Sequence, residues 1–154
     1  MHDALYFATL ISYVQGLAML QQASKTLAME IPMPKVIKVW RGGCIIRSSM
    51  LDLFSQAFEQ DPTRENLLLD SNIASVLKSK AEGLRKIVSV SAQNGYPCGT
   101  FMSSLSYYDA YLSDRMPTNL IQAQRDYFGA HTYQRIDEPE TFFHSEWMSN
   151  KVNV

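Results

Sequence analysis

The feature that most constrains the fold is a long run without a charged residue, from Ala4 to Ser24. Its apolar residues recur at helical spacing, and others lie outside that stripe, whereas a helix with one wet side would show a clearer polar face. A membrane span needs about 20 mostly apolar residues, but Gln15, Gly16 and Gln21 interrupt this run. We therefore predict a core helix over about residues 4–29 rather than a membrane span.

Helical periodicity continues along the chain, and no segment of strand period and comparable length competes with it. Pro, Gly, Asp-Pro and Asn-Gly separate the apolar segments and mark helix ends. Asp3 and Thr118 are expected to cap the first and last helices. Asp70 or Ser71 is expected to cap the helix near residue 72. The pattern predicts an all-α, multi-helix single domain over 1–154, with an irregular tail at 129–154 and helices at about 4–29, 35–40, 44–60, 72–94, 100–114 and 118–128.

The charge balance argues against a polyanionic partner. The chain has 14 basic and 15 acidic residues, so no field of one sign favours nucleic acid or an anionic membrane. The densest basic segment, 78–86, is interrupted by Glu82 and is typical of a solvated helix face. The N-terminus lacks the basic start and cleavage site of a signal peptide. We expect a cytoplasmic protein with no nucleic-acid and no membrane partner.

Motifs for self-contained catalysis are absent from the sequence. The seven glycines form neither G-x-G-x-x-G nor a P-loop, and no G-x-S-x-G occurs. Cys44 and Cys98 lack zinc-site spacing and are interpreted as reduced, buried thiols, with a disulfide left open at this stage. Glu140 and His144 are only two potential ligands, which is too few for a metal site. We expect no catalytic residue, no cofactor-binding residue and no metal ligand in this chain.

One segment, "NLIQAQRDYFGAHTY" (119–133), places Arg125 and His131 on either side of a helix end near Gly129. Gly129 can adopt the left-handed backbone that stops a helix. Arg125 then lies in the last turn, and His131 follows on a segment turned back toward the same end. A guanidinium holds a phosphate through two parallel hydrogen bonds, and an imidazole adds another. The segment therefore raises the hypothesis of a site for an anionic group.

The alternative interpretation is structural, and spacing alone favours it. Arg125 would pair with Asp126 or Gln122 on a solvated surface, and His131 would be a packed polar residue. Beyond this segment the periodicity dissolves, but the tail keeps apolar residues at Phe142–Phe143 and Trp147. Apolar side chains on an irregular tail usually dock on another surface. That surface would belong either to the same chain or to another subunit.

Five motifs follow one another in a characteristic order: "WRGGCIIRS" (40–48), "NLLLD" (66–70), "LSYYDAY" (105–111), "NLIQAQRDYFGAHTY" (119–133) and "FFHSEW" (142–147). With these motifs the chain resembles the C-terminal all-helical domain of the 6-phosphogluconate dehydrogenase (decarboxylating) family. That family oxidatively decarboxylates 6-phosphogluconate to ribulose 5-phosphate with NADP, in the pentose phosphate pathway and in gluconate utilisation.

The resemblance implies a homodimer in which the C-terminal tail crosses into the neighbouring subunit. It also implies that Arg125 and His131 bind the phosphate of 6-phosphogluconate and thereby complete the partner's substrate site. On this basis the chain is expected to be the dimerisation and substrate-completing part of an NADP-dependent enzyme.

The chain also departs from the family pattern. The N-terminal NADP-binding domain and the front of the helical domain, which carry the lysine base and the glutamate acid, have no counterpart here. The chain alone is therefore expected to bind no NADP and to be inactive, and to expose apolar surface that favours self-association. The alternatives are a helical self-association module without catalytic context and a phosphosugar-binding domain that acts alone.

Overall fold

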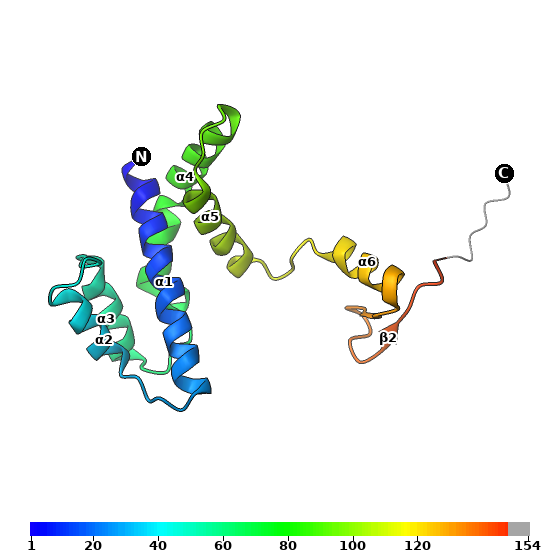
Figure 1. Ribbon diagram of the computed structural model, residues 1–154, viewed down its shortest axis with the longest axis horizontal. Helices are drawn as coiled ribbons and strands as arrows, with labels where there is room; N and C mark the ends of the chain where they lie inside the picture. Colours follow the sequence, from blue (N-terminus) through cyan, green and yellow to red (C-terminus); the bar gives the residue numbers. More distant parts are fainter. Residues whose placement is uncertain (148–154) are drawn as a thin grey trace. The chain divides into compact units, whose positions relative to one another are not determined.

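The computed structural model describes residues 1–147, and the regular secondary structure of this part is helical apart from one short ladder of two strands (Figure 1). The all-α prediction is confirmed. Contacts divide the chain into two compact units, Met1–Asp109 (unit 1) and Ala110–Val154 (unit 2). The single domain expected from the sequence stays a prediction. The elements are α1 (His2–Thr26), α2 (Met33–Arg41), α3 (Met50–Gln60), the 3-10 helix η1 (Leu67–Leu69), α4 (Ser71–Gln93), α5 (Gly99–Leu112), α6 (Asn119–Gly129), β1 (Tyr133–Gln134) and β2 (Phe142–Phe143).

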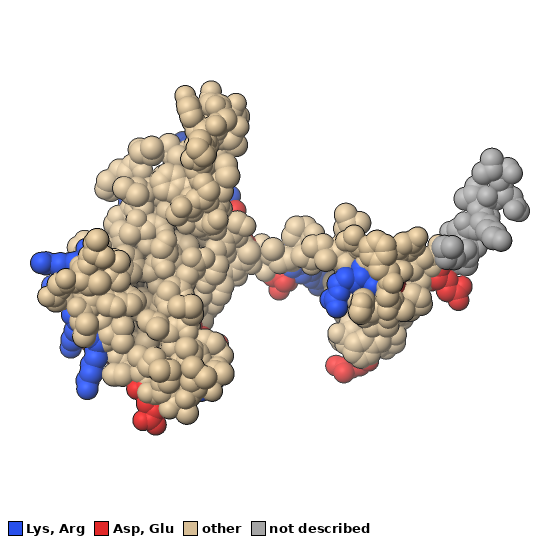
Figure 2. Space-filling model, in the orientation of Figure 1, with Lys and Arg blue, Asp and Glu red and all other residues tan. Residues whose placement is uncertain are grey.

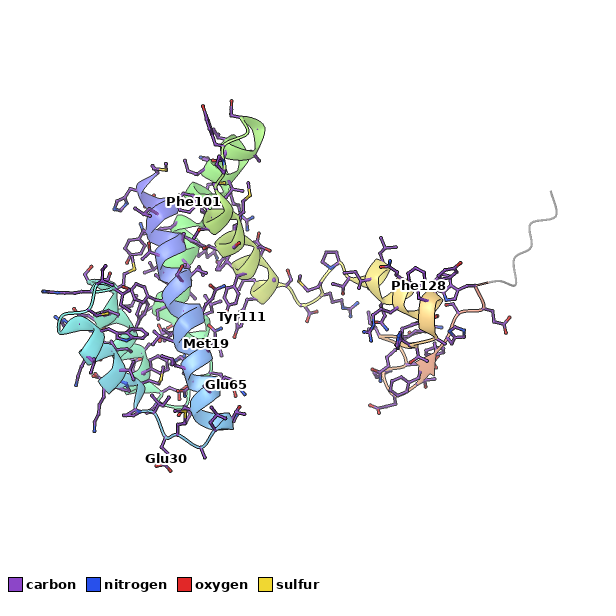
Figure 3. All side chains as sticks on the ribbon, viewed as in Figure 1. Met19, Glu30, Glu65, Phe101, Tyr111 and Phe128 are labelled. Atoms are coloured by element: carbon purple, nitrogen blue, oxygen red, sulfur yellow. The ribbon has the colours of Figure 1, made fainter. Side chains whose placement is uncertain are left out.

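Helix α1 supplies the centre of the core of unit 1. It packs along α4 and against η1, while α2 packs on α3. Phe7, Leu10 and Leu17 of α1 are fully buried, as a core helix requires. The second half of α1 is less enclosed, because Met19 is 67% exposed (Figure 3). By length and composition alone α1 also suffices to cross a membrane, but its buried face belongs to the core cluster of unit 1.

The packing of α1 on α4 gives Asp3 a role other than the predicted helix cap. Helix α1 begins at His2 without a side-chain cap, so the prediction that Asp3 caps it is wrong. Asp3 lies within the first turn, where its carboxylate accepts a hydrogen bond from Lys80 Nζ at 2.7 Å. A Cβ atom at Gly83 would stand 2.9 Å from Asp3 Cβ, so only a glycine lets the two helices approach this closely.

The caps of the later helices follow the sequence more closely. Asp70 Oδ1 accepts hydrogen bonds from the N–H groups of Asn72 and Ile73, which confirms it as the cap of α4. Thr118 occupies the cap position of α6 but makes no side-chain hydrogen bond there.

The predicted helix 44–60 is too long at its start. Helix α3 begins at Met50, and residues 44–49 form turns. Gly43 has a φ of 149°, a conformation that side-chain-bearing residues rarely adopt, so the chain changes direction there. Cys44 is exposed in these turns and Cys98 is half-buried, and both are free. The prediction of buried thiols is therefore wrong for Cys44.

Unit 2 contains α6, β1 and β2. The two strands pair antiparallel, with Tyr133 opposite Phe143, and these rings stack with centroids 6.0 Å apart. Residues 148–154 of the predicted tail lie outside the described part of the chain.

Among the described residues of unit 2, one side chain is buried, and it is the carboxylate of Asp126. The larger apolar residues stay in contact with solvent: Phe128 on α6 is 73% exposed (Figure 3) and Leu120 is 81% exposed. Most of the surface in view in Figure 2 carries neither acidic nor basic side chains. The described part of unit 2 is therefore held together by polar contacts rather than by an apolar core.

Candidate functional site

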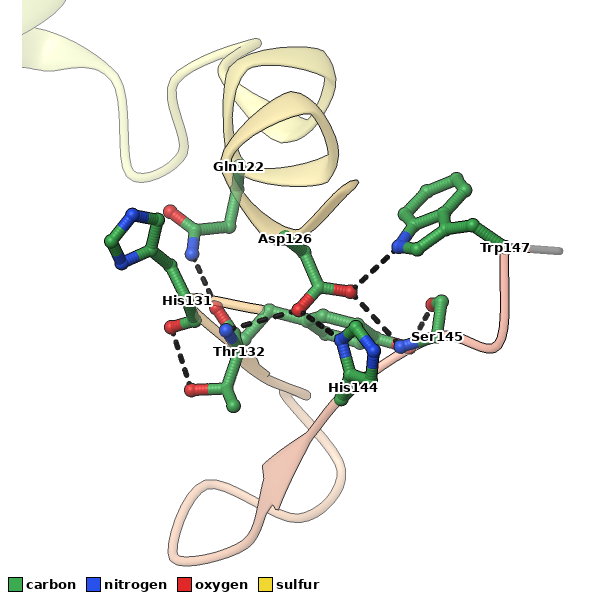
Figure 4. A network of polar contacts seen from close by, with 8 residues as sticks. Gln122, Asp126, His131, Thr132, His144, Ser145 and Trp147 are labelled. Atoms are coloured by element: carbon green, nitrogen blue, oxygen red, sulfur yellow. Dashed lines mark hydrogen bonds and ion pairs between the residues drawn. The ribbon is translucent and has the colours of Figure 1, made fainter. Parts of the chain in front are cut away.

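The end of α6 is organised by Asp126, whose side chain is 0% exposed (Figure 4). Its Oδ1 atom accepts a hydrogen bond from the Thr132 N–H at 3.0 Å and lies 2.9 Å from His144 Nδ1. Its Oδ2 atom accepts hydrogen bonds from the Ser145 N–H at 2.9 Å and from the Trp147 indole N–H at 3.0 Å. One carboxylate thus joins α6 to Thr132, just after the helix, and to residues 144–147 of the tail.

These contacts keep the carboxylate charged. Burial by itself raises the pKa of Asp126, but the hydrogen bonds from its four partners outweigh burial and lower the pKa from 3.8 to about 2. An ionised carboxylate only accepts hydrogen bonds. His144 Nδ1 therefore carries the proton in its contact with Asp126.

The tail is docked on its own unit by the same contacts. The Trp147 ring also meets the Tyr127 ring edge-on, with centroids 5.9 Å apart. Of the two surfaces considered for the tail, the described residues up to Trp147 thus use one that belongs to unit 2 itself. A crossing of the tail to another subunit stays a prediction.

The segment after α6 has a backbone that needs support. Ala130, with a φ of 49°, ends the helix, and Thr132 has a φ of 60°. Left-handed conformations in residues other than glycine cost about 1–3 kcal/mol each and persist where neighbours hold them. Here the Ala130 N–H donates to the Asp126 carbonyl at 2.9 Å, and the Thr132 carbonyl accepts from Gln122 Nε2. Two turns of α6 therefore fix residues 130–132.

The role predicted for Gly129 is wrong, because the left-handed residue that ends the helix is Ala130. Gly129 instead provides space. A Cβ atom there would stand 2.9 Å from His131 Nε2 and 3.1 Å from His131 Cδ2. The imidazole therefore lies directly against the helix backbone, and a side chain at Gly129 would displace it.

Arg125 and His131 line the same open cleft, which has a volume of about 350 Å³. Both residues are exposed, and the hydrogen bond from Arg125 Nη1 to Gln122 Oε1 is long, at 3.5 Å. Asp126, the other partner considered for Arg125, faces the tail instead (Figure 4). A guanidinium and an imidazole that share a cleft in this way can hold an anion. The other lining residues are Gln122, Thr132, Tyr133, Gln134 and Phe142.

A second arginine of unit 2 shows the contrast. Arg135 donates to both carboxylate oxygens of Asp137, with its Nε 3.0 Å from Oδ1. Its guanidinium carbon also lies 5.4 Å from the centre of the Phe143 ring. Arg135 therefore has a carboxylate partner of its own, whereas the hydrogen-bond partner of Arg125 among residues 1–147 is the amide oxygen of Gln122.

No metal centre accompanies the cleft within residues 1–147, because no three His, Cys, Asp or Glu side chains there gather closely enough to hold an ion. Sequence reasoning missed Asp126 as an organising residue. One signal was available: a carboxylate in the last turn of a helix opposes the negative end of the helix dipole, so it needs strong partners of its own.

Comparisons with known proteins give a consistent result. The family model of the 6-phosphogluconate dehydrogenase C-terminal domain matches residues 1–147. The decarboxylating 6-phosphogluconate dehydrogenase of Lactococcus lactis subsp. lactis (strain IL1403) is 47% identical over 144 residues, which are 94% of this chain and 30% of that protein. The NADP(+)-dependent, decarboxylating enzyme of Bacillus subtilis (strain 168) is 43% identical over 145 residues, or 94% of this chain and 31% of that protein.

A solved structure is similar as well. Plasmodium falciparum 6-phosphogluconate dehydrogenase, studied in its apo form and in complexes with its cofactor NADP+ and its substrate 6-phosphogluconate, matches with a TM-score of 0.87 and 41% identity. The match covers 94% of this chain and 31% of that chain. The chain thus spans about 30% of the length of the curated relatives it matches.

Proposed function

The chain belongs to the 6-phosphogluconate dehydrogenase family, and from this premise we propose that it completes the substrate site of an NADP-dependent, decarboxylating 6-phosphogluconate dehydrogenase. The family resemblance predicted from the sequence motifs is confirmed. In the proposed role, Arg125 and His131 hold the phosphate of 6-phosphogluconate, while the enzyme oxidises and decarboxylates the sugar acid to ribulose 5-phosphate in the pentose phosphate pathway.

The observation that carries this proposal is the shared cleft of Arg125 and His131. A guanidinium fork can bind two phosphate oxygens through parallel hydrogen bonds, and an imidazole that lines the same cleft can donate to a third. An anchored phosphate fixes the far end of the substrate, so that the reacting carbons meet their catalytic groups in a defined orientation. The side chains named here bind and orient the substrate and take no part in the chemical step.

The chemistry itself is proposed to reside in the part of the enzyme that this chain does not match. NADP would accept the hydride there, and an acid–base pair would act on the sugar acid. We therefore infer that the chain alone binds no NADP and has no dehydrogenase activity. Appearance of NADPH on mixing the purified chain with 6-phosphogluconate and NADP would contradict this inference.

The exposed apolar residues of unit 2 support a homodimer as the working assembly. Phe128 and Leu120 are large apolar side chains of α6 in contact with solvent, and their burial against a partner would be favourable. In the proposed dimer, unit 2 lies against the neighbouring subunit, and the Arg125–His131 cleft completes the substrate site of that neighbour.

The test uses a hybrid enzyme, in which this chain replaces the matching C-terminal segment of the Lactococcus lactis relative. Arg125→Ala is expected to raise the KM for 6-phosphogluconate at least tenfold, since a hydrogen bond to a charged group contributes about 1.5–3 kcal/mol. The KM for NADP should stay the same, because the cofactor binds elsewhere in the proposal.

Arg135→Ala is the matched control, because this arginine is already paired with Asp137. It should leave both KM values within about twofold. An unchanged KM for 6-phosphogluconate in the Arg125 variant would overturn the phosphate-binding role.

A second candidate function, self-association without a catalytic context, is favoured by the same exposed apolar residues. Both functions predict a dimer in sedimentation experiments, and a strict monomer at high concentration would contradict both. They differ in the kinetic test, because a pure association module gives a hybrid enzyme whose KM does not depend on Arg125. A phosphosugar-binding role for the chain alone would require micromolar binding of 6-phosphogluconate in calorimetry.

A further inference from the structure

The buried carboxylate of Asp126 is not used by the proposed function, although it accepts a hydrogen bond from Thr132, one of the residues that line the cleft. It follows Arg125 in sequence, and neighbouring residues of a helix point about 100° apart. Arg125 therefore faces the cleft while Asp126 faces the tail (Figure 4). Asp126 also holds the N–H of Thr132, the residue that follows His131.

We propose that Asp126 is a positioning residue of the cleft, and that docking of tail residues 144–147 on its carboxylate sets the place of His131. As far as it concerns phosphate, this proposal rests on the proposed function. Its structural part, the coupling of the tail to the His131 segment through one carboxylate, stands on the contacts alone.

The backbone that carries His131 depends on hydrogen bonds from its neighbours. His131 lies between Ala130 and Thr132, which both have left-handed backbones. Such conformations relax when their anchors are removed. The N–H of Thr132 has its anchor in Asp126 Oδ1 at 3.0 Å. Loss of this hydrogen bond would let the backbone of Thr132 relax, and the imidazole of the preceding residue, His131, would move with it.

The carboxylate of Asp126 is shared between the His131 segment and the tail. Asp126 Oδ2 is held by the Ser145 N–H and the Trp147 indole, at 2.9 and 3.0 Å. With both donors in place, the carboxylate plane is fixed and Oδ1 points at Thr132. Without them the group can rotate about its own bond, and the contact with Thr132 weakens. The state of the tail is therefore transmitted to His131 through a single rigid group.

The test is Trp147→Phe in the full chain, which removes one donor to Oδ2 and keeps an aromatic ring beside Tyr127. We expect the amide of Thr132, bonded to the other oxygen, to exchange its hydrogen on the order of tenfold faster, and the imidazole signals of His131 to shift in NMR spectra. Trp40→Phe, the same replacement in unit 1, is the control and should leave both readouts unchanged.

The amide of Ala130 is an internal control for unfolding of the end of α6. It donates to the backbone carbonyl of Asp126, so it should stay protected if the end of α6 remains folded. Unchanged exchange at Thr132 would overturn the proposal. Faster exchange at Ala130 and Thr132 together would overturn it too, because Trp147 would then stabilise the helix end as a whole.

The KM of the hybrid enzyme for 6-phosphogluconate separates this proposal from the proposed function. If Arg125→Ala raises this KM and Trp147→Phe raises it too as Thr132 loses protection, both stand. If Arg125→Ala leaves the KM unchanged but Thr132 still responds to Trp147→Phe, the phosphate role fails and the coupling stands. If Arg125→Ala raises the KM and Thr132 does not respond, the coupling fails and the phosphate role stands.

Discussion

The two units of the chain are stabilised by opposite means. Unit 1 buries Phe7, Phe54 and other apolar side chains in one continuous cluster. The described part of unit 2 buries one carboxylate and leaves its apolar side chains in contact with solvent. Burial of apolar side chains is non-directional, whereas a hydrogen-bonded carboxylate demands defined directions. The difference suits unit 1 to be a scaffold and unit 2 to hold a binding cleft in place.

Removing one phenylalanine ring from each unit should give the largest difference in stability between them. Phe54→Ala in the core of unit 1 is expected to lower the free energy of unfolding by about 3–5 kcal/mol. Phe128→Ala on α6 is expected to change it by less than about 0.5 kcal/mol in the monomer, where this residue is 73% exposed. Urea denaturation followed by circular dichroism measures both, at a protein concentration at which sedimentation shows only monomer. Equal losses under these conditions would contradict the contrast between the units, whereas a loss for Phe128→Ala that appears only at higher concentration is expected from the dimer proposed above.

Acid should act on unit 2 before it acts on the core of unit 1. The pKa of Asp126 in the folded chain is about 2, below its value of 3.8 when unfolded. The stabilisation by this group is therefore complete above pH 3.8 and is lost as the pH falls toward about 2. The amide of Ser145, which donates to Asp126, should lose its protection from hydrogen exchange in this window, while the amide of Leu10 in the core of α1 keeps its own.

Protection of Ser145 that persists well below pH 2 would show that Asp126 does not hold the tail. A matched change at Leu10 would show that the two units unfold as one.

Two glycine-to-alanine substitutions, one in each unit, compare the packing of the units with smaller expected effects. In Gly83→Ala the new methyl group meets Asp3 Cβ at 2.9 Å, between two packed helices. Such overpacking costs about 1–3 kcal/mol. In Gly129→Ala the methyl group meets the end of the His131 side chain, also at 2.9 Å, which can move aside.

We therefore expect Gly83→Ala to lower the melting temperature and Gly129→Ala to leave it nearly unchanged. In the hybrid enzyme, Gly129→Ala should still raise the KM for 6-phosphogluconate several-fold, because His131 is displaced. A normal KM with a displaced imidazole would remove His131 from the phosphate site.

The sequence predicted most of unit 1 because its determinants are local or periodic. The charge-free run around Leu10 indicated the core helix. Asp70 occupies the N-cap position of α4, a position that aspartate favours. The turns around Cys44 were missed because the apolar pattern of the next helix continues back through them at Ile45 and Ile46.

In unit 2 the sequence predicted Arg125 and His131 as site residues, but it did not predict the contacts that support them. The partners of Asp126 in the tail, from His144 to Trp147, lie far along the chain from α6, so no local pattern connects them. Gly129 was assigned to helix termination because that is the commonest role of a glycine at a helix end. Its actual role, space for a neighbouring ring, depends on how the chain folds back after Ala130.

The central claim is that Arg125 and His131 complete the substrate site of the neighbouring subunit. Mixing two inactive variants of the hybrid enzyme tests it directly: one carries Arg125→Ala and His131→Ala, and the other lacks the acid–base residues of the remaining part. After dissociation and reassociation, the account predicts that activity returns, because each mixed dimer contains one site with both intact contributions. No recovery of activity in verified mixed dimers would contradict it, since the cleft would then serve only its own subunit.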